Sequence, residues 1–492
     1  MKNTLRILLA AIPLSMLSMV SAGYASVDIG GKSSGNTEPY PYISPTPGEF
    51  PIIGWGIYKE TSRSVFKDFF GCGFNAAMIM PNKYVLSQML TALNPVAGED
   101  TIKLSLIQYM EGLMDNYKPE ETQEYMDYIM DLYSNYMHSG NQTPVSGWMP
   151  HDEPTYYQLD AWAPYFHTIA QHDPTRMVWM NLFGDPKYTE AYRPVESDLN
   201  NRLTLKDYIE AYCEKFRPGV LSYDYYPFNV DTSGVDRTIE RGRLDDFYTA
   251  LQLYSEISKK RDRPFWAFCQ CKATCVDEAN EYKPTDGHPV PTEIFLRYEA
   301  FNALAFGAQG IEYWRYQELK IPVEKPDTNV YYALVTKDGK KTPAWYFAQR
   351  VNKEIKSWTN VFLGAKLDSY YFVGDPRDTS YCDYKVGPSA DAIYVQDLSP
   401  RDTAGSNRGA LVSTLVNGDN NYVVIVNQSP YEPVSLRLGL NEKQYSISEL
   451  KNYATAPLSL DNVIGSFTPI KNVNITLSPG QYTIYSYRRK SK

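Results

Sequence analysis

The stretch that decides the fold is VSGWMPHDEP, residues 145–154. A mostly apolar run ends here in three polar residues and a proline, and a helical pattern over residues 156–172 follows. This pattern predicts a buried strand that brings Asp152 and Glu153 to a junction between strand and loop. Pro154 marks where the strand stops, because proline lacks the N–H group that a β-ladder needs. The alternative is that Asp152 and Glu153 only cap the next helix.

The same alternation of strand and helix extends over residues 51–358. Short apolar runs alternate with amphipathic stretches, which is the pattern of βα units. The expected strands lie at 51–58, 74–80, 103–108, 145–151, 177–183, 219–225, 264–270 and 310–314. Eight such units in about 300 residues match the number and length of a (β/α)8 TIM barrel. A doubly wound sheet would often show a glycine-rich phosphate turn near the first strand, and the sequence has none.

After residue 358 the helical pattern gives way to short strands. These are expected at 369–374, 392–396, 411–416, 422–427, 434–438, 444–447, 473–477 and 482–487. The run Asn417-Gly418-Asp419-Asn420 between two of them is expected to form a hairpin turn. The sequence therefore predicts a TIM barrel over residues 51–358, followed by an all-β sandwich over residues 359–492.

Residues 1–22 have the pattern of a secretory signal peptide. Lys2 and Arg6 precede an apolar run at 7–19, and Val20-Ser21-Ala22 fits a cleavage site of small residues. The apolar run is too short for a membrane span, and no later stretch approaches about 18 apolar residues. Residues 23–50 are rich in Gly, Ser, Pro and Thr and are expected to form a flexible leader. We therefore expect an exported protein, periplasmic or extracellular, with no membrane span.

The composition of the chain limits the kinds of partner that it is expected to bind. The net charge of −9 argues against a nucleic-acid partner, because phosphate binding needs a basic surface. The 42 tyrosines suit sugar-binding clefts, although they also suit ordinary surfaces. The six cysteines are expected to be buried thiols or to form one local disulfide, since Cys271 and Cys275 have no histidine or second cysteine pair at zinc-site spacing. No metal or cofactor is expected, and the sequence does not indicate an oligomeric state.

Polar and aromatic side chains gather at the predicted carboxyl ends of the barrel strands, where TIM barrels carry their catalytic groups. These residues are Trp55, Tyr58, Glu60, Asn82, His151, Asp152, Glu153, Asn181, Asp185, Asp224, Tyr225, Tyr226, Gln270, Glu312, Trp314, Arg315 and Tyr316. Sugar hydrolysis needs such a set: one carboxylic acid protonates the glycosidic oxygen, and a second carboxylate attacks carbon or activates water. The chain has no histidine pair at metal-ligand spacing and no Gly-x-Ser-x-Gly motif, which disfavours a metallohydrolase and an esterase.

The motif Trp148-Met149-Pro150-His151-Asp152-Glu153-Pro154 resembles the Asn-Glu-Pro signature of clan A glycoside hydrolases, with Asp152 in place of the asparagine. Residues 177–183, 222–228 and 307–314 look like those of secreted barrel glycosidases of gut bacteria. Residues 477–480, Leu-Ser-Pro-Gly, are similar to the β-sandwich that follows such barrels. The resemblance implies a carbohydrate substrate and makes Glu153 the acid/base. It departs at the nucleophile, because clan A enzymes carry a glutamate at the end of the seventh strand, where this chain has Gln270.

The second carboxylate is therefore open between Asp224 and Glu312. Asp224 lies on the sixth strand, which carries the acid in the α-galactosidase-like barrel clan. It is preferred because the tyrosines around it could orient it. The alternatives are a structural carboxylate for Asp224 and burial of Glu312 against Arg315 or another basic group. The candidate substrate-binding residues are Trp55, Asp152, Asn181, Tyr226, Gln270 and Trp314, of which the aromatic ones could equally belong to the core.

These observations predict an exported glycoside hydrolase that acts through paired carboxyl groups on a poly- or oligosaccharide. A protein of another class, a non-catalytic glycan-binding protein on a degenerate barrel, is the alternative, and Gln270 is its best support. A barrel lyase or esterase that acts on polysaccharide is a third possibility.

Overall fold

The computed structural model describes fifteen segments of the chain, and the expected signal peptide and most of the expected leader lie outside them. The described residues are 38–57, 62–79, 83–94, 96–110, 112–136, 145–187, 203–228, 241–275, 289–317, 330–336, 339–374, 392–399, 408–450, 461–462 and 471–491. The chain divides into two compact units, residues 1–38 and 39–492, and the second contains the whole fold described below.

Nine parallel strands form the first sheet, in the order β5-β4-β3-β2-β1-β10-β8-β7-β6. They are β1 (Ile52–Ile57), β2 (Ala76–Ile79), β3 (Ser105–Tyr109), β4 (Val145–Met149), β5 (Met177–Val178), β6 (Asn181–Phe183), β7 (Leu221–Asp224), β8 (Phe265–Gln270) and β10 (Ile311–Trp314). The strands at the two edges, β5 and β6, are separated in the chain only by Trp179 and Met180. The two edges of the sheet therefore meet in one segment, and the sheet closes into a barrel of eight βα units.

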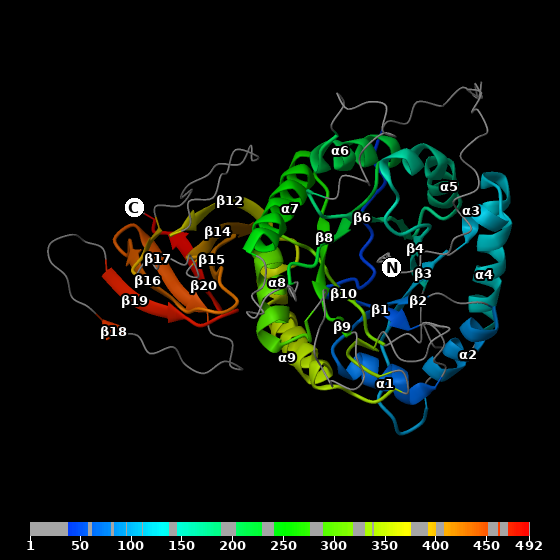
Figure 1. Cartoon of the computed structure of the whole chain (residues 1–492), viewed down its shortest axis with the longest axis horizontal. Coiled ribbons are helices and arrows are strands. Elements are labelled where there is room, and N and C mark those ends of the chain that lie inside the picture. The colour runs from blue at the N-terminus through cyan, green and yellow to red at the C-terminus, as the bar shows by residue number, and fades with distance from the viewer. Residues whose placement is uncertain are drawn as a thin grey trace, which may run out of the picture. The chain divides into compact units, whose positions relative to one another are not determined.

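Helices follow the strands and surround the barrel (Figure 1). They are α1 (Arg63–Gly71), α2 (Lys83–Leu93), α3 (Leu113–Asn116), α4 (Thr122–Tyr136), α5 (Leu159–His172), α6 (Leu205–Phe216), α7 (Arg241–Lys260), α8 (Glu293–Ala305), α9 (Pro343–Ser357) and α10 (Thr359–Phe362). Each expected barrel strand overlaps an observed one, so the predicted TIM barrel is confirmed. The small antiparallel pair β9 (Ala273–Cys275) and β11 (Val330–Tyr332) was not predicted, because its strands have only three residues each. None of the described helices is long and apolar enough to cross a membrane.

Side chains alternate along each barrel strand between two cores, as strand geometry requires. Those facing inward form an apolar plug that includes Met149, Trp179 and Trp266, with the two indole rings edge to face at 5.2 Å. Those facing outward pack under the helices. Gly147 faces inward beside Trp179, and a Cβ atom there would lie 2.5 Å from the indole ring. Only glycine fits at this position of β4, because the plug is filled to van der Waals density.

Two antiparallel sheets follow, so the predicted β-sandwich is confirmed (Figure 1). One sheet has the order β12-β14-β15-β20-β17 and the other β13-β16-β19-β18. Their strands are β12 (Lys366–Val373), β13 (Ile393–Asp397), β14 (Ala410–Asn417), β15 (Asn420–Asn427), β16 (Val434–Leu440), β17 (Tyr445–Leu450), β18 (Asp461–Asn462), β19 (Lys471–Leu477) and β20 (Tyr482–Arg489). The expected hairpin turn joins β14 to β15 through Asn417 and Asn420, and Gly418 adopts the positive φ that it needs.

Buried polar contacts attach the sandwich to the barrel helices. The Tyr482 hydroxyl donates to Glu354 Oε1 at 2.7 Å and accepts a hydrogen bond from Trp358 Nε1 at 2.6 Å.

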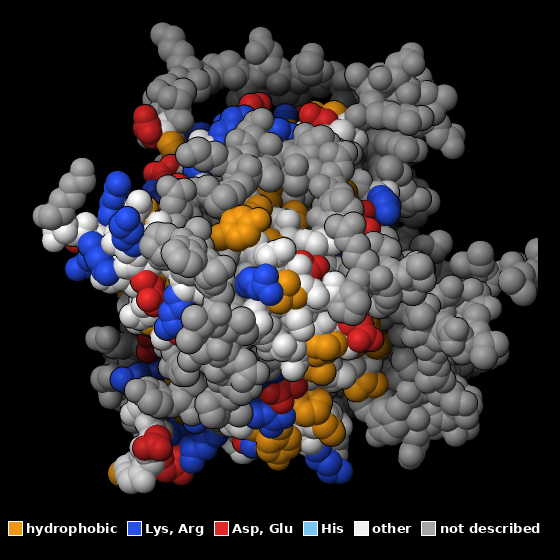
Figure 2. Space-filling view, turned by 90° about the vertical axis from the view of Figure 1, so that its left-hand side faces the viewer, with side chains coloured by type: hydrophobic (Ala, Val, Ile, Leu, Met, Phe, Trp, Pro, Cys, Tyr) orange, Lys and Arg blue, Asp and Glu red, His pale blue; other side chains and the backbone are white. Residues whose placement is uncertain are grey.

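The face drawn in Figure 2 carries basic and acidic side chains side by side, with hydrophobic ones among them.

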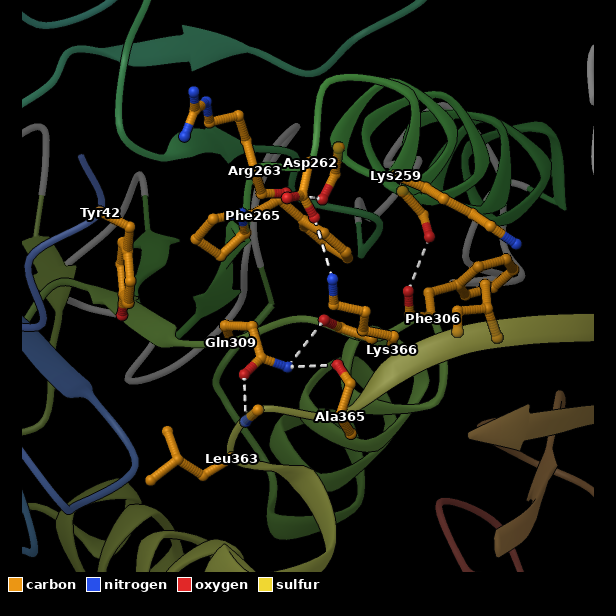
Figure 3. Close-up of a pocket in the computed structure, with 16 residues that line it drawn as sticks. Tyr42, Lys259, Asp262, Arg263, Phe265, Phe306, Gln309, Leu363, Ala365 and Lys366 are labelled. Carbon is orange, nitrogen blue, oxygen red and sulfur yellow. Dashed lines mark hydrogen bonds and ion pairs between the residues drawn. The ribbon is translucent and has the colours of Figure 1, made fainter. Parts of the chain in front are cut away.

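A cavity of about 540 Å³ lies near the junction of barrel and sandwich (Figure 3). It is lined by Pro264 and Phe265 at the start of β8, and by Gln309 before β10. The Gln309 carboxamide is fully engaged, since Nε2 donates to Ala365 O at 3.0 Å and Oε1 accepts from Gly364 N at 2.7 Å. Because the lining residues precede the strands, the cavity lies at the amino ends of the barrel strands, away from the rim where catalytic groups are expected.

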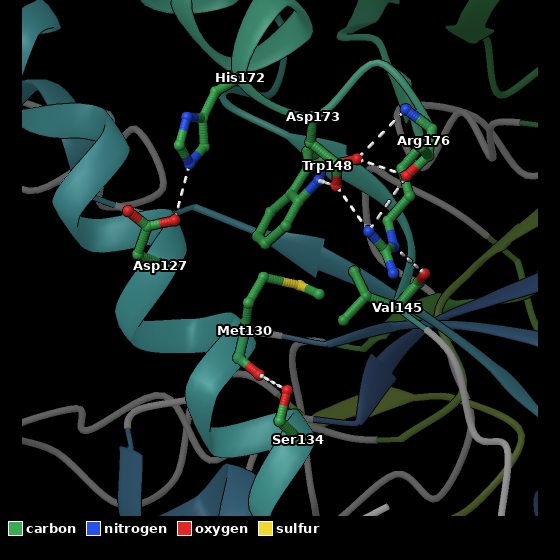
Figure 4. Close-up of polar contacts among 9 residues, drawn as sticks. Asp127, Met130, Ser134, Val145, Trp148, His172, Asp173 and Arg176 are labelled. Atoms are coloured by element: carbon green, nitrogen blue, oxygen red, sulfur yellow. Dashed lines mark hydrogen bonds and ion pairs between the residues drawn. The ribbon is translucent and has the colours of Figure 1, made fainter.

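Strand β4 is anchored from its outer face (Figure 4). The Trp148 indole Nε1 donates to Asp173 Oδ2 at 2.8 Å. Arg176 Nη1 donates to the same oxygen at 2.8 Å, and its Nε donates to Val145 O at 2.6 Å. Since Trp148 is held outward, Met149 must face inward, and the chain reaches the rim with Asp152 and Glu153 in a defined orientation.

Replacing Asp173 by alanine should destabilise the fold by about 2–3 kcal/mol, because it leaves the buried Trp148 indole N–H without its acceptor and removes the ion pair to Arg176 Nη1. The matched control is Asp127→Ala, which removes the exposed contact with His172 Nε2 at 2.7 Å (Figure 4). That change should stay within about 0.5 kcal/mol. Urea unfolding of both variants tests this, and equal losses would contradict the anchoring role of Asp173.

Candidate active site

A polar layer lies directly above the apolar plug. Asn181 on β6, Ser222 on β7 and Glu312 on β10 face inward at this level, and they are 2%, 0% and 0% exposed. Asn181 is the register partner of Ser222 across the β6–β7 ladder. These side chains are buried because the barrel wall surrounds them and the apolar plug lies below them.

Asn181 is the centre of this layer. Its Nδ2 donates to Asp152 Oδ1 at 3.1 Å and to Asp224 Oδ1 at 3.0 Å, and its Oδ1 accepts from Ser222 Oγ at 3.0 Å. Its backbone carbonyl accepts from the Glu153 N–H at 2.9 Å. One residue therefore connects the loop after β4 to the end of β7.

Glu153 occupies a sharp turn, with a φ of +48°. This left-handed conformation costs about 1 kcal/mol or more for a residue other than glycine, and it persists only where neighbouring groups hold it. Here the hydrogen bond to Asn181 O holds the backbone, and the carboxyl group is hydrogen-bonded to that of Asp224. Burial raises the pKa of Glu153 well above its ordinary value, and the charges of Asp224 and Asp152 add to the rise.

The two aspartates also bind protons more readily than usual. Burial raises the pKa of Asp152 to about 8, the charges of Asp224 and Glu312 add to this, and the hydrogen bond from Asn181 opposes it. Burial raises the pKa of Asp224 as well, although hydrogen bonds from Glu153, Asn181 and the Tyr226 hydroxyl favour its ionised form. Carboxyl groups this close cannot all be charged, so the cluster holds protons at neutral pH.

Glu312 lies deepest. Its Oε2 accepts from Trp55 Nε1 at 2.8 Å, and its Oε1 lies 2.6 Å from Ser222 Oγ. Both partners are neutral, so the alternative of burial against Arg315 does not describe these contacts. Burial raises the pKa of Glu312 to about 7, and the Asp224 charge adds to the rise. The Trp55 ring packs edge to face on Trp314 at 5.9 Å.

Gln270, at the expected nucleophile position, has both ends of its carboxamide engaged. Its Oε1 accepts from the Phe228 N–H at 3.1 Å, and its Nε2 donates to Phe228 O at 2.8 Å. Its backbone N–H donates to both carboxylate oxygens of Glu299, at 3.1 Å each. In this arrangement Gln270 supports the loop after β7, which carries Tyr226.

Several other rim residues lie apart from the cluster. His151 stacks on Trp162 at 4.4 Å, and burial lowers its pKa to about 4. The Asp185 carboxylate accepts from the Lys187 N–H, and the Tyr225 hydroxyl donates to the Arg243 carbonyl. Tyr58, Glu60 and Asn82 lie outside the described residues.

The structure thus brings together Trp55, Asp152, Glu153, Asn181, Asp224, Tyr226 and Glu312. Sequence reasoning missed Ser222 and Glu299. Ser222 lies two residues before Asp224 on the same strand face, so the period of two could have indicated it. Glu299 lies in the stretch Tyr298–Ala305 of α8, which is apolar except for Glu299 itself and Asn302. An acidic residue in such a stretch is a weak signal that its carboxylate has a buried partner.

Within the described segments, no group of three or more His, Cys, Asp or Glu residues could hold a metal ion. Cys72, Cys213, Cys269 and Cys271 are free and buried, which confirms the expectation of buried thiols for these four. Burial raises the pKa of the Cys269 and Cys271 thiols well above the ordinary value, so they are held in the unreactive form.

Residues 193–358 match the family Glyco_hydro_42, described as Beta-galactosidase. This range includes Asp224, Gln270 and Glu312 and begins after Glu153 and Asn181. No curated protein matches the chain.

Three solved structures match this chain at low sequence identity. A catalytic mutant of Gan42B, a GH42 β-galactosidase from G. stearothermophilus, is 9% identical, with 92% of this chain and 100% of that one covered and a TM-score of 0.47. The β-galactosidase of Rahnella sp. R3 is 9% identical, with 92% and 100% covered and a TM-score of 0.44. Xylanase Xyn30A from Clostridium acetobutylicum is 11% identical, with 92% and 98% covered and a TM-score of 0.41. Likenesses at this level say nothing about substrate or catalytic residues.

The cluster should make stability depend on pH with a defined sign. An acid whose pKa is raised on folding binds more protons in the folded state than in the unfolded state, so stability falls as pH rises from the unfolded pKa to the folded one. For Asp152 this window extends from about 4, the value expected in an unfolded chain, to about 8. We expect the protein to be less stable at pH 8 than at pH 5, and Asp152→Asn to reduce this difference by about 1–3 kcal/mol.

Urea unfolding at the two pH values measures the effect. The matched control is Asp131→Asn, which makes the same change at an exposed position of α4 and should leave the pH dependence as it is in the wild type. An unchanged difference in the Asp152 variant would show that Asp152 does not bind its proton more tightly in the folded state.

Proposed function

We propose that this protein is a glycoside hydrolase that cleaves O-glycosidic bonds of an oligo- or polysaccharide, with Glu153 as general acid/base and Asp224 as its carboxylate partner. The observation that carries the proposal is the hydrogen-bonded pair of these carboxyl groups at the carboxyl ends of the barrel strands. A glycosidase needs one carboxyl group that is still protonated at neutral pH and one carboxylate beside it.

The environment of each residue favours this division of roles. Asp224 accepts hydrogen bonds from Asn181, Tyr226 and Glu153, all of which stabilise a carboxylate. Glu153 receives no such set from the described residues and is held protonated by burial and by the neighbouring charges. Glu153 is then ready to protonate a leaving oxygen, and Asp224 is placed to stabilise the positive charge that develops on the sugar ring.

The two carboxyl groups of the pair lie closer together than those of either class of glycosidase. Retaining enzymes separate their two carboxyl groups by about 5–5.5 Å and inverting enzymes by about 6.5–9.5 Å. A direct hydrogen bond between Glu153 and Asp224 is shorter than either spacing. We therefore propose that the pair shares a proton in the resting protein and separates when a sugar enters.

The matched family description suggests the first substrates. The Glyco_hydro_42 match over residues 193–358 supports β-galactosides as the class to test before others. Export of the protein is also a proposal, supported by the signal-like pattern of residues 1–22.

One observation favours a second candidate, a glycan-binding protein without catalysis. Gln270 stands where clan A enzymes carry their nucleophile, and its carboxamide is engaged with Phe228. Such a protein would bind oligosaccharides in calorimetry and release no product from them.

Glu153→Gln should lower turnover of an unactivated oligosaccharide by about 10²–10⁴, because the leaving oxygen loses its proton donor. The loss should be much smaller with dinitrophenyl glycosides, whose leaving group departs without protonation. The measurement compares kcat/KM for the two kinds of substrate across a panel of glycosides. Glu124→Gln makes the same change at an exposed position of α4 and serves as the matched control.

Equal losses on both substrates would show that Glu153 is not the general acid. Turnover of the oligosaccharide that survives the change would remove Glu153 from the reaction altogether. Binding without turnover by the wild type would favour the glycan-binding alternative.

A further inference from the structure

We infer that Glu312 is held as a neutral carboxylic acid whose proton orients the Asn181 amide through Ser222. Glu312 is then a positioning residue, not the second catalytic carboxylate. Its protonation is inferred from the hydrogen-bonding needs of the buried groups and does not depend on any substrate, whereas its effect on turnover rests on the function proposed above.

Asn181, Ser222 and Glu312 form a row of hydrogen bonds, and each group in it has a fixed number of hydrogens to donate. Asn181 Nδ2 has two hydrogens, and it donates them to Asp152 Oδ1 and Asp224 Oδ1. Its Oδ1 has none, and a buried amide oxygen needs a donor; among the described residues that donor is the Ser222 hydroxyl, 3.0 Å away. A hydroxyl has only one hydrogen. The same hydroxyl lies 2.6 Å from Glu312 Oε1 and could donate there instead. We assign its one hydrogen to Asn181, because this satisfies both buried oxygens, and Ser222 Oγ then accepts the proton of Glu312.

The other carboxyl oxygen agrees with this assignment. Oε2 accepts from Trp55 Nε1 at 2.8 Å, so it serves as the carbonyl oxygen of the acid. A neutral carboxylic acid offers one donor and one acceptor, and the two partners of Glu312 require that combination. The 2.6 Å contact lies in the short part of the range for O–H···O hydrogen bonds.

The surroundings also disfavour a charge on Glu312. The residue is fully buried, Phe268 lies beside it in the ladder, and the acidic groups nearest along the hydrogen-bond chain are Asp224 and Asp152. An ionised Glu312 would add a further negative charge to this cluster. The pKa of Glu312 is raised, which also favours its neutral form.

The proton matters because it fixes which way the amide faces. With the amide reversed, Oδ1 would face both aspartates, and each would have to be protonated to donate to it. With the amide as it stands, two N–H groups face Asp152 and Asp224 and favour the ionised form of Asp224. That carboxylate is the acceptor for the Glu153 proton. The Glu312 proton thus acts on the pair at the rim through two intervening side chains.

The test compares Glu312→Gln with Glu312→Ala. Glutamine reproduces the neutral acid, because its Nε2 can donate to Ser222 Oγ and its Oε1 can accept from the Trp55 indole. Alanine supplies neither group. If the alanine variant does not fold, Ser222→Ala breaks the same link and leaves the carboxyl group in place.

The first readout is infrared spectroscopy of the resting protein at pH 7, without substrate. The wild-type spectrum should contain one more carbonyl stretch of a buried protonated carboxylic acid, shifting in D2O, than the Glu312→Gln spectrum, because Glu153 stays protonated in both proteins. No loss of such a band in Glu312→Gln would overturn the inference. Because no substrate is involved, this result is independent of whether the protein is a glycosidase.

The second readout is turnover. The alanine variant should lose about 10–100-fold, as for other groups that act by orienting a catalytic residue, and glutamine should recover most of that loss. If Glu312→Gln is instead as inactive as Glu153→Gln, Glu312 works as a carboxylate and the positioning role is wrong.

Discussion

The carboxamide of Asn181 is the constraint on which the site depends, because an amide offers two hydrogens on one side and none on the other. Its position comes from the way the barrel closes. Residues 177–183 pair with β4 at their start and with β7 at their end, and Trp179 and Met180 lie between. The segment that closes the barrel therefore carries Asn181 to a point between Asp152 and Asp224. Asn181 therefore lies in the segment that closes the barrel and also donates the hydrogen bonds to the two aspartates.

Four carboxyl groups, those of Asp152, Glu153, Asp224 and Glu312, surround this amide in a buried layer. Burying an unpaired charge costs several kcal/mol, so such groups bind protons unless hydrogen bonds stabilise the charged form. Here the donors are unevenly distributed. Asp224 accepts three hydrogen bonds, while Glu153 donates one to it. In the proposed function, this uneven distribution makes Glu153 the acid and Asp224 the carboxylate, with Asp152 and Glu312 as supporting residues. The positive φ of Glu153 and the closeness of the carboxyl groups lower the stability of the fold. The packed plug and the anchored strand β4 must offset this loss.

The sequence predicted the fold and most members of the site for a simple reason. Strand period, helix period and turn residues are local, and the C-terminal end of each barrel strand has a fixed place on the rim. Asp152, Glu153, Asn181 and Asp224 follow from that rule. The pairing of side chains does not, because it depends on register between strands far apart in the chain. Nothing local to Gln270 reveals that Phe228 occupies its carboxamide, and nothing near Trp55 reveals that its indole N–H faces Glu312.

The roles within the site were hardest to predict, because they depend on where protons reside. Two glutamates at strand ends look alike in sequence, yet Glu312 lies between an indole N–H and a hydroxyl, and Glu153 lies beside a carboxylate. Neutron diffraction from deuterated crystals at pH 7 would test the central claim most directly. The account predicts a deuteron on Glu153 toward Asp224 and another on Glu312 Oε1 toward Ser222. Nuclear density that shows both glutamates without deuterons, with Ser222 donating to Glu312, would contradict it.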